Sequence, residues 1–122
     1  LQIIELCGSD MPVYSGDDST ACELMLNGAS GTISVTANVA PAQMAVMCKA
    51  ALAGNSEEAN KLNQPLLALH ENLFLEANPI PVKWALAEMG KIKRGIRLPL
   101  TELSAEYHEA VKSAMRQAGI AN

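Results

Sequence analysis

Polar residues whose side chains could bind a substrate gather at two places in the first third of the chain. The first is Ser-Gly-Asp-Asp at residues 15–18, and the second contains Ser34, Thr36 and Asn38. Each group lies where a short β-branched run is expected to end a strand. Parallel sheets place their chemistry at the carboxyl ends of strands, so both groups are expected to face one site.

The elements that must position these groups have a strand, helix, strand pattern. Residues Met11–Ser15 are predicted as a strand, Ser19–Leu26 as a helix and Gly31–Thr36 as a second strand. This order predicts a right-handed βαβ unit, the repeat of parallel α/β proteins. The simplest role of Asp17 or Asp18 is then to cap the helix, because aspartate is favoured at that position.

The remaining chain has mainly helical periodicity. Pro41 suits a first helical position, Ser56 is expected to cap the helix that it begins, and Pro65 is expected to kink that helix. Residues 91–103 are expected to form a loop. Helices are expected near residues 1–7, 41–52, 56–74, 81–89 and 104–118.

Several other residues have simple structural explanations. His70 lies on the apolar face of its predicted helix, which favours a core or interface histidine over a base or a ligand. His108 lies one residue off the apolar stripe of the last helix and is expected to be solvated. Trp84 is interpreted as a packing residue. The second polar group has the composition of turn and loop hydrogen-bonders rather than of catalytic residues.

Composition argues against several kinds of partner and site. The 122 residues carry a net charge of −4 with no basic run, which argues against a nucleic acid or an anionic membrane as partner. No apolar run approaches the ~20 residues that cross a bilayer. The three cysteines include no CxxC pair, which indicates reduced thiols in the cytoplasm. The two histidines lack ligand partners at metal spacing, so no metal is expected.

The chain is interpreted as the C-terminal part of a longer protein. It begins without Met, as though inside a helix, and two strands alone make a poor sheet because edges and faces need covering. The missing N-terminal part, or a symmetric partner, is expected to cover them. The alternative is a stand-alone helical interaction module without enzymatic activity, which predicts that the 122 residues fold cooperatively alone.

Four segments together resemble a known enzyme family. They are SGDD at 15–18, ISVTANVAP at 33–41, NPIPVKWA at 78–85 and RLPLTELS at 97–104. In this order they resemble the C-terminal part of the bacterial dihydrodipicolinate synthases, also called 4-hydroxy-tetrahydrodipicolinate synthases. The resemblance runs from about Ile3 to the C-terminus. NPIPVKWA favours the synthases over related sialic-acid and keto-deoxy-sugar lyases, which remain the alternative within the class.

The resemblance implies an α/β fold, part of a (β/α)8 TIM barrel with an added C-terminal helical domain. Residues 1–40 would hold the last two parallel strands, the seventh and eighth of the barrel. Residues 41–122 would hold the barrel-closing helix and the helical domain. Members of the family are commonly homotetramers, so the intact subunit is expected to form a homo-oligomer.

The resemblance also implies the chemistry. Family enzymes condense pyruvate with L-aspartate semialdehyde in lysine and diaminopimelate biosynthesis, through a Schiff base on a lysine near the end of the sixth strand. They use no metal and no organic cofactor. None of the lysines here lies on a predicted strand, and neither Tyr14 nor Tyr107 matches the family's proton relay. The catalytic residues are therefore expected upstream, and the 122 residues alone are expected to be inactive.

Three residues are carried over as candidates for substrate binding. Ile33 corresponds to the family residue whose carbonyl lies near the Schiff base in the pyruvate pocket. Gly16 resembles the glycine whose backbone approaches the substrate, as a residue without Cβ permits. Asp17 would lie beside the pocket and order the loop or a water. The side chain of Ile33 itself is expected to be an ordinary core residue.

Overall fold

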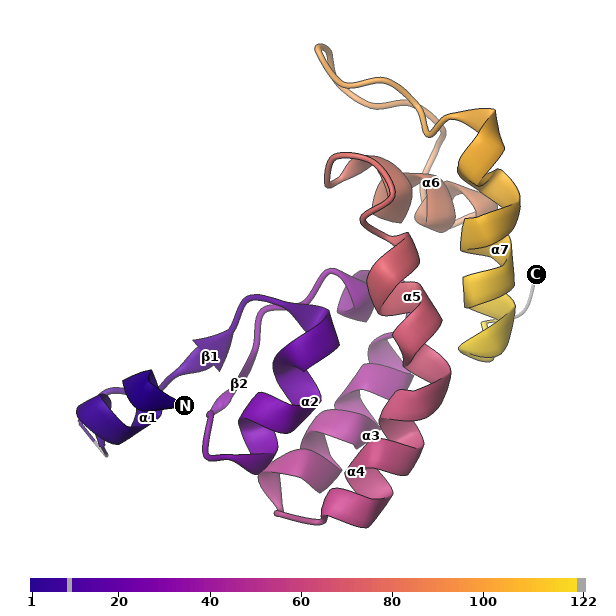
Figure 1. Ribbon diagram of the computed structural model, residues 1–122. Coiled ribbons are helices and arrows are strands. Elements are labelled where there is room, and N and C mark those ends of the chain that lie inside the picture. The colour runs from indigo at the N-terminus through magenta and orange to yellow at the C-terminus, as the bar shows by residue number, and fades with distance from the viewer. Residues whose placement is uncertain (9, 121–122) are drawn as a thin grey trace.

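The computed structural model describes residues 1–8 and 10–120. Figure 1 shows the short strands and α1 at one end of the molecule, and α6 and α7 at the other, with α2–α5 between them. The elements are, in order, α1 (Gln2–Cys7), β1 (Tyr14–Ser15), α2 (Asp18–Leu26), β2 (Gly31–Thr32), η1 (Thr36–Asn38), α3 (Pro41–Leu52), α4 (Ser56–Asn63), η2 (Gln64–Leu66), α5 (Leu67–Asn72), α6 (Ile80–Glu88), η3 (Ala105–Tyr107) and α7 (His108–Gln117).

The two strands form a parallel pair joined by α2, as predicted. Tyr14 pairs with Gly31, and Ser15 pairs with Thr32. The predicted lengths of the strands were wrong, because each strand contains only two residues. Beyond Thr32 the amide of Ile33 still donates to Ser15, but the amides of Val35 and Thr36 bind a carboxylate of α2, so the strand does not continue to Thr36. Thr36 therefore begins a 3₁₀ turn.

Helix α2 begins as the capping rule predicts. Asp17 is the N-cap, and its side chain accepts a hydrogen bond from the amide of Thr20 at 3.1 Å. Ala21 and Met25 are buried and Leu24 is partly buried, so one side of the helix faces the core. This helix therefore packs its apolar face inward and keeps the capping carboxylate at the surface.

The next helices match their periodicity, with two corrections. Pro41 is the first residue of α3, as predicted. The cap of α4 is Asn55 and not Ser56: the Asn55 side chain accepts a hydrogen bond from the amide of Glu58 at 3.2 Å. The single helix expected over 56–74 is three elements, α4, η2 and α5. Pro65 lacks an amide hydrogen, and it lies in the 3₁₀ turn that interrupts the α-helical hydrogen bonds.

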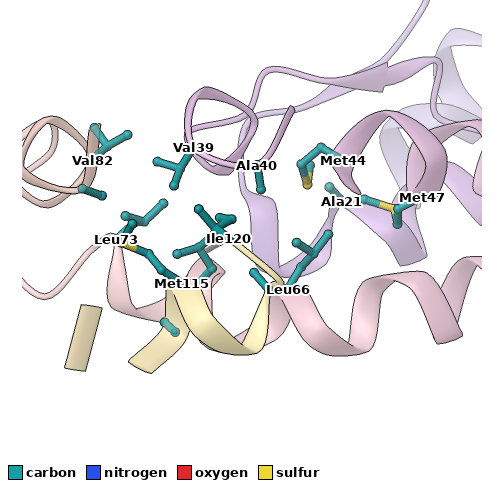
Figure 2. Close-up of a cluster of buried hydrophobic side chains, with 14 of the residues drawn as sticks. Ala21, Val39, Ala40, Met44, Met47, Leu66, Leu73, Val82, Met115 and Ile120 are labelled. Carbon is teal, nitrogen blue, oxygen red and sulfur yellow. The ribbon is translucent and has the colours of Figure 1, made fainter. Parts of the chain in front are cut away.

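One apolar core joins most of these elements. Figure 2 shows Val39, Leu73, Met115 and Ile120 gathered between helices that are distant in sequence. The same core continues through Met47 of α3, which is fully buried. Its side chains are aliphatic or sulfur-containing, apart from Trp84. Within residues 1–8 and 10–120, no helix has the length and apolarity to cross a membrane.

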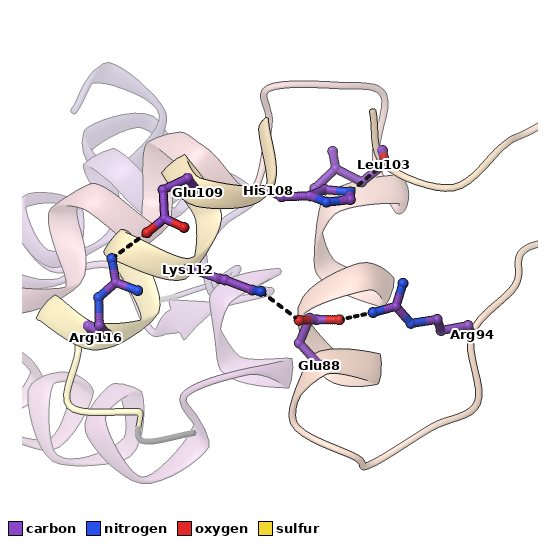
Figure 3. Close-up of polar contacts among 7 residues, drawn as sticks. All are labelled: Glu88, Arg94, Leu103, His108, Glu109, Lys112 and Arg116. Carbon is purple, nitrogen blue, oxygen red and sulfur yellow. Dashed lines mark hydrogen bonds and ion pairs between the residues drawn. The ribbon is translucent and has the colours of Figure 1, made fainter. Parts of the chain in front are cut away.

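His108 is partly buried, so the prediction that it is solvated was wrong. Its ring stacks on Trp84 with centroids 4.4 Å apart, and its Nε2 lies 2.9 Å from the carbonyl of Leu103. Figure 3 shows Lys112 of α7 and Arg94 of the 91–103 loop both reaching Glu88 of α6. The stacked ring and the shared carboxylate hold α6, α7 and the loop together. The sequence pattern missed this because the aromatic partner lies on another helix.

Candidate functional site

Asp18 joins the two polar groups that the sequence predicts at one site. Its side chain is 2 % exposed, and its Oδ2 accepts hydrogen bonds from the amides of Val35 and Thr36, each at 2.9 Å. Its Oδ1 has no hydrogen-bond partner among the described residues. A buried carboxylate is stabilised by such charge-assisted bonds. Asp18 therefore fixes the loop after β2 to the start of α2.

Asp17 is exposed, and its carboxylate is hydrogen-bonded to residues of the helix that it caps. Its Oδ2 accepts hydrogen bonds from Ser19 Oγ at 2.6 Å and from Thr20 Oγ1 at 2.7 Å. These hydroxyl donors lower the pKa of Asp17, because they stabilise the ionised form. The carboxylate is thus held as an anion at the helix terminus, which suits a structural or water-ordering role better than proton abstraction.

Ser15 and Gly16 connect the end of β1 to this cap. The Ser15 hydroxyl donates to the carbonyl of Asp17 at 2.9 Å, and the Ser15 carbonyl accepts from the amide of Ile33 at 2.8 Å. Gly16 has no left-handed φ, and a Cβ built on it would meet no atom within 4 Å. Nothing in the fold of the described residues therefore requires a glycine at position 16.

Ile33 lies just beyond β2, with its side chain 74 % exposed. The expectation of an ordinary core side chain was wrong within the described residues. The backbone of Ile33 is nevertheless fixed, because its amide donates to Ser15. Ile33 and Gly16 therefore belong to the same junction at the end of the strand pair. Their substrate-binding roles stay predictions.

A buried chain of hydrogen bonds runs from this junction into the helices. Thr36 is fully buried, and its Oγ1 lies 2.9 Å from His70 Nδ1. His70 Nε2 lies 3.1 Å from Asn63 Oδ1. Burial lowers the pKa of His70, although the nearby Asp18 and Asp17 oppose that shift. The interpretation of His70 as a satisfied core histidine is confirmed. The hydrogen bond between His70 and Thr36 was not predicted. The position of His70 on the apolar face of its helix was the only sequence feature that pointed to a buried histidine.

The other polar residues of the second group act within their own turn, as predicted. Ser34 Oγ accepts from the amide of Ala37 at 2.9 Å, and Asn38 donates to the carbonyl of Val35 at 3.1 Å. The described part of the chain contains no group of three or more His, Cys, Asp or Glu side chains that could hold a metal. The lysines lie on helices or in the 91–103 loop, at positions 49, 61, 83, 91, 93 and 112.

Comparison with known proteins decides the family. The model of the dihydrodipicolinate synthetase family matches residues 1–118. The chain belongs to this family. The 4-hydroxy-tetrahydrodipicolinate synthase of Methylococcus capsulatus is 60 % identical over 119 residues, which are 98 % of this chain and 41 % of that protein. The synthase of Pseudomonas aeruginosa is 58 % identical over the same proportions.

Solved synthase structures have the same fold over this length. The chloride-inhibited dihydrodipicolinate synthase of Acinetobacter baumannii, crystallised with pyruvate, superposes with a TM-score of 0.96 at 53 % identity. That superposition covers 98 % of this chain and 41 % of the other. The synthase of Aquifex aeolicus superposes with a TM-score of 0.91 at 37 % identity, over 98 % and 41 % of the two chains. The chain therefore spans about two fifths of the length of these relatives.

Proposed function

We propose that these residues supply the C-terminal part of a 4-hydroxy-tetrahydrodipicolinate synthase, a lyase of lysine and diaminopimelate biosynthesis. One observation carries this proposal: the chain matches synthases along 98 % of its own length but along only 41 % of theirs. The polypeptide that corresponds to the other part of these enzymes supplies the rest of the barrel and the reactive lysine. The 122 residues alone are inactive.

The proposed division of the chain follows the elements. Residues 1–40 form the end of a (β/α)8 barrel, with β1 and β2 as its last two strands. Residues 41–122 form the barrel-closing helix and the C-terminal helical domain. The parallel pairing of β1 and β2 across α2 supports this arrangement, because a barrel repeats that unit.

The proposed site lies at the carboxyl end of this strand pair. The carbonyl of Ile33 lines the pyruvate pocket, Gly16 allows the substrate to approach its backbone, and Asp17 orders the adjoining loop. The open space beside Gly16 and the fixed amide of Ile33 support these roles. The pyruvate in the Acinetobacter baumannii structure identifies the class of first substrate in a close relative.

In the complete enzyme the reaction forms a carbon–carbon bond. The lysine amine condenses with the ketone of pyruvate and releases water, which gives a Schiff base. Loss of a proton from the methyl carbon gives an enamine, and this carbon attacks the aldehyde of aspartate semialdehyde. The residues of this chain bind and orient pyruvate, and the amine and the proton relay come from the remaining barrel. The reaction needs no metal or organic cofactor.

Exposed apolar residues before, within and after the strand pair support a missing covering layer. Leu6 of α1 is 86 % exposed and Ile33, just beyond β2, is 74 % exposed, whereas large apolar surfaces of soluble domains are usually covered. Met11, which precedes β1, and Tyr14, which lies in β1, are also exposed. The remaining barrel strands would cover this face and pair the free strand edges. The complete subunits would then assemble as a homo-oligomer.

A chimeric synthase tests the proposal. Its aligned C-terminal residues come from this chain, and its remaining residues come from the Methylococcus capsulatus enzyme. We expect the chimera to condense pyruvate with aspartate semialdehyde. We also expect borohydride to trap one pyruvate adduct on the chimera and none on the 122-residue chain. A chimera that folds but forms no adduct, or a 122-residue chain that turns over pyruvate, would contradict the proposal. Assays with the aldehydes of sialic-acid and keto-deoxy-sugar lyases separate the alternative activities.

A further inference from the structure

Residues 33–36, which follow β2 at the proposed site, are held at both ends of this segment by residues from different parts of the chain. At its start, the amide of Ile33 donates to the Ser15 carbonyl. At its end, Asp18 accepts from the amides of Val35 and Thr36. The Thr36 side chain is held separately, by the histidine of α5. The four residues 33–36 are therefore held by β1, by α2 and by α5.

The hydrogen-bond partners of His70 fit one neutral tautomer of its ring. Asn63 Oδ1 lies 3.1 Å from Nε2, and an amide oxygen only accepts hydrogen bonds, so this orientation of the Asn63 side chain matches a proton on Nε2. In the neutral ring, Nδ1 is then an acceptor. In this tautomer the Thr36 hydroxyl donates to Nδ1 across 2.9 Å. One neutral tautomer satisfies both nitrogen atoms of a ring that is 2 % exposed.

We infer that His70 is a positioning residue for the pyruvate pocket, acting through Thr36 on the backbone of residues 33–36. This inference rests on the proposed function for its kinetic consequence. His70 touches no substrate. Its neutral ring orients the Thr36 hydroxyl, and this contact, together with Asp18, sets the direction of the Ile33 carbonyl. Asn63 of α4 holds the ring in turn, so the helices after residue 41 help to shape the site.

Kinetics of the chimeric synthase test this role with matched variants. Thr36→Val removes the hydroxyl and nearly keeps the volume, Thr36→Ser keeps the hydroxyl, and His70→Phe removes both ring nitrogens. We expect Thr36→Val and His70→Phe to raise the KM for pyruvate roughly tenfold, as the loss of one buried hydrogen bond produces. Thr36→Ser should stay within about twofold of the parent. Leu69→Ala, in the fully buried neighbour of His70, should lower stability without changing this KM.

A purely structural role would give a different result. An unchanged KM in both Thr36→Val and His70→Phe, with only a lower unfolding midpoint, would overturn the inference. So would nitrogen NMR of selectively labelled histidine that shows the His70 proton on Nδ1. If the unaltered chimera folds but has no synthase activity, the proposed function fails. The NMR measurement then decides the positioning contact independently, through the tautomer and through altered Ile33–Thr36 amide signals in Thr36→Val.

Discussion

Asp17 and Asp18 are neighbours in sequence, yet they stabilise the protein in different ways. Asp17 is an exposed helix cap, whereas Asp18 is buried and binds two amides of a distant loop. We expect Asp17→Ala to lower the free energy of unfolding by about 1 kcal/mol, as loss of a cap does. We expect Asp18→Ala to lower it by about 3 kcal/mol, because it leaves amides without partners. Urea unfolding of both variants measures the difference, and equal losses would contradict it.

Gly16 provides a test of function without a loss of stability. A methyl group at this position meets no atom of the described chain, so Gly16→Ala should change the free energy of unfolding by less than about 0.5 kcal/mol. In the chimeric synthase the same methyl group would enter the proposed pocket and lower kcat/KM for pyruvate roughly tenfold or more.

The matched control for this prediction is Gly54→Ala. Gly54 has φ +73°, so alanine there should lower stability by about 1 kcal/mol and leave kcat/KM unchanged. An unchanged kcat/KM in Gly16→Ala would count against a pocket at position 16.

The buried His70 predicts a pH dependence of stability. Burial lowers its pKa below the value of 6.5 that it has when unfolded, despite the nearby Asp17 and Asp18. The unfolded chain then binds the proton more tightly, so this contribution is complete above pH 6.5 and is lost as the pH falls from there toward the folded pKa. Unfolding measured between about pH 7 and pH 5 should show this loss, and His70→Gln should remove it. An identical pH dependence of stability in His70→Gln would show that His70 is not the group responsible for the loss.

At the scale of elements, two neighbouring residues, Asn55 and Ser56, could each cap α4, and the structure shows which one does. Asn55 accepts the hydrogen bond from the Glu58 amide, and Ser56 is the first residue of the helix. We expect Asn55→Ala to lower the free energy of unfolding by about 1 kcal/mol, and Ser56→Ala to change it by less than about 0.5 kcal/mol. Thermal unfolding of the pair measures this. A larger loss of stability in Ser56→Ala than in Asn55→Ala would show that Ser56 caps the helix, as the sequence predicts.

At the scale of the whole molecule, α1 and the strand pair carry several exposed apolar side chains. Because β1 and β2 have free edges beside exposed apolar side chains, we expect the 122-residue chain to associate with itself as concentration rises. Leu6→Lys and Ile33→Lys should weaken this association, since each replaces an exposed apolar side chain near the strand pair with a charged one. Leu98→Lys changes an equally exposed leucine in the distant 91–103 loop and should have no effect. Sedimentation velocity distinguishes the variants, and a parent that stays monomeric would contradict the prediction.

Local patterns in the sequence determined most elements of this protein. Hydrogen bonds within one segment account for the cap at Asp17, the start of α3 at Pro41 and the interruption at Pro65. Periodicity within one segment accounts for the burial of Met44 and Met47. The family also follows from the sequence, because its motifs are continuous segments, and the match over residues 1–118 confirms it.

Only the tertiary structure decided what joins those segments. The bonds from Asp18 to Val35 and from Thr36 to His70 link residues 17 and 34 positions apart, and no periodicity encodes such a pair. The stacking of His108 on Trp84 also depends on how two helices cross. Buried polar groups must find partners wherever packing brings them, so the amides of Val35 and Thr36, which the sequence pattern assigns to the second strand or its end, bind Asp18 instead of a strand.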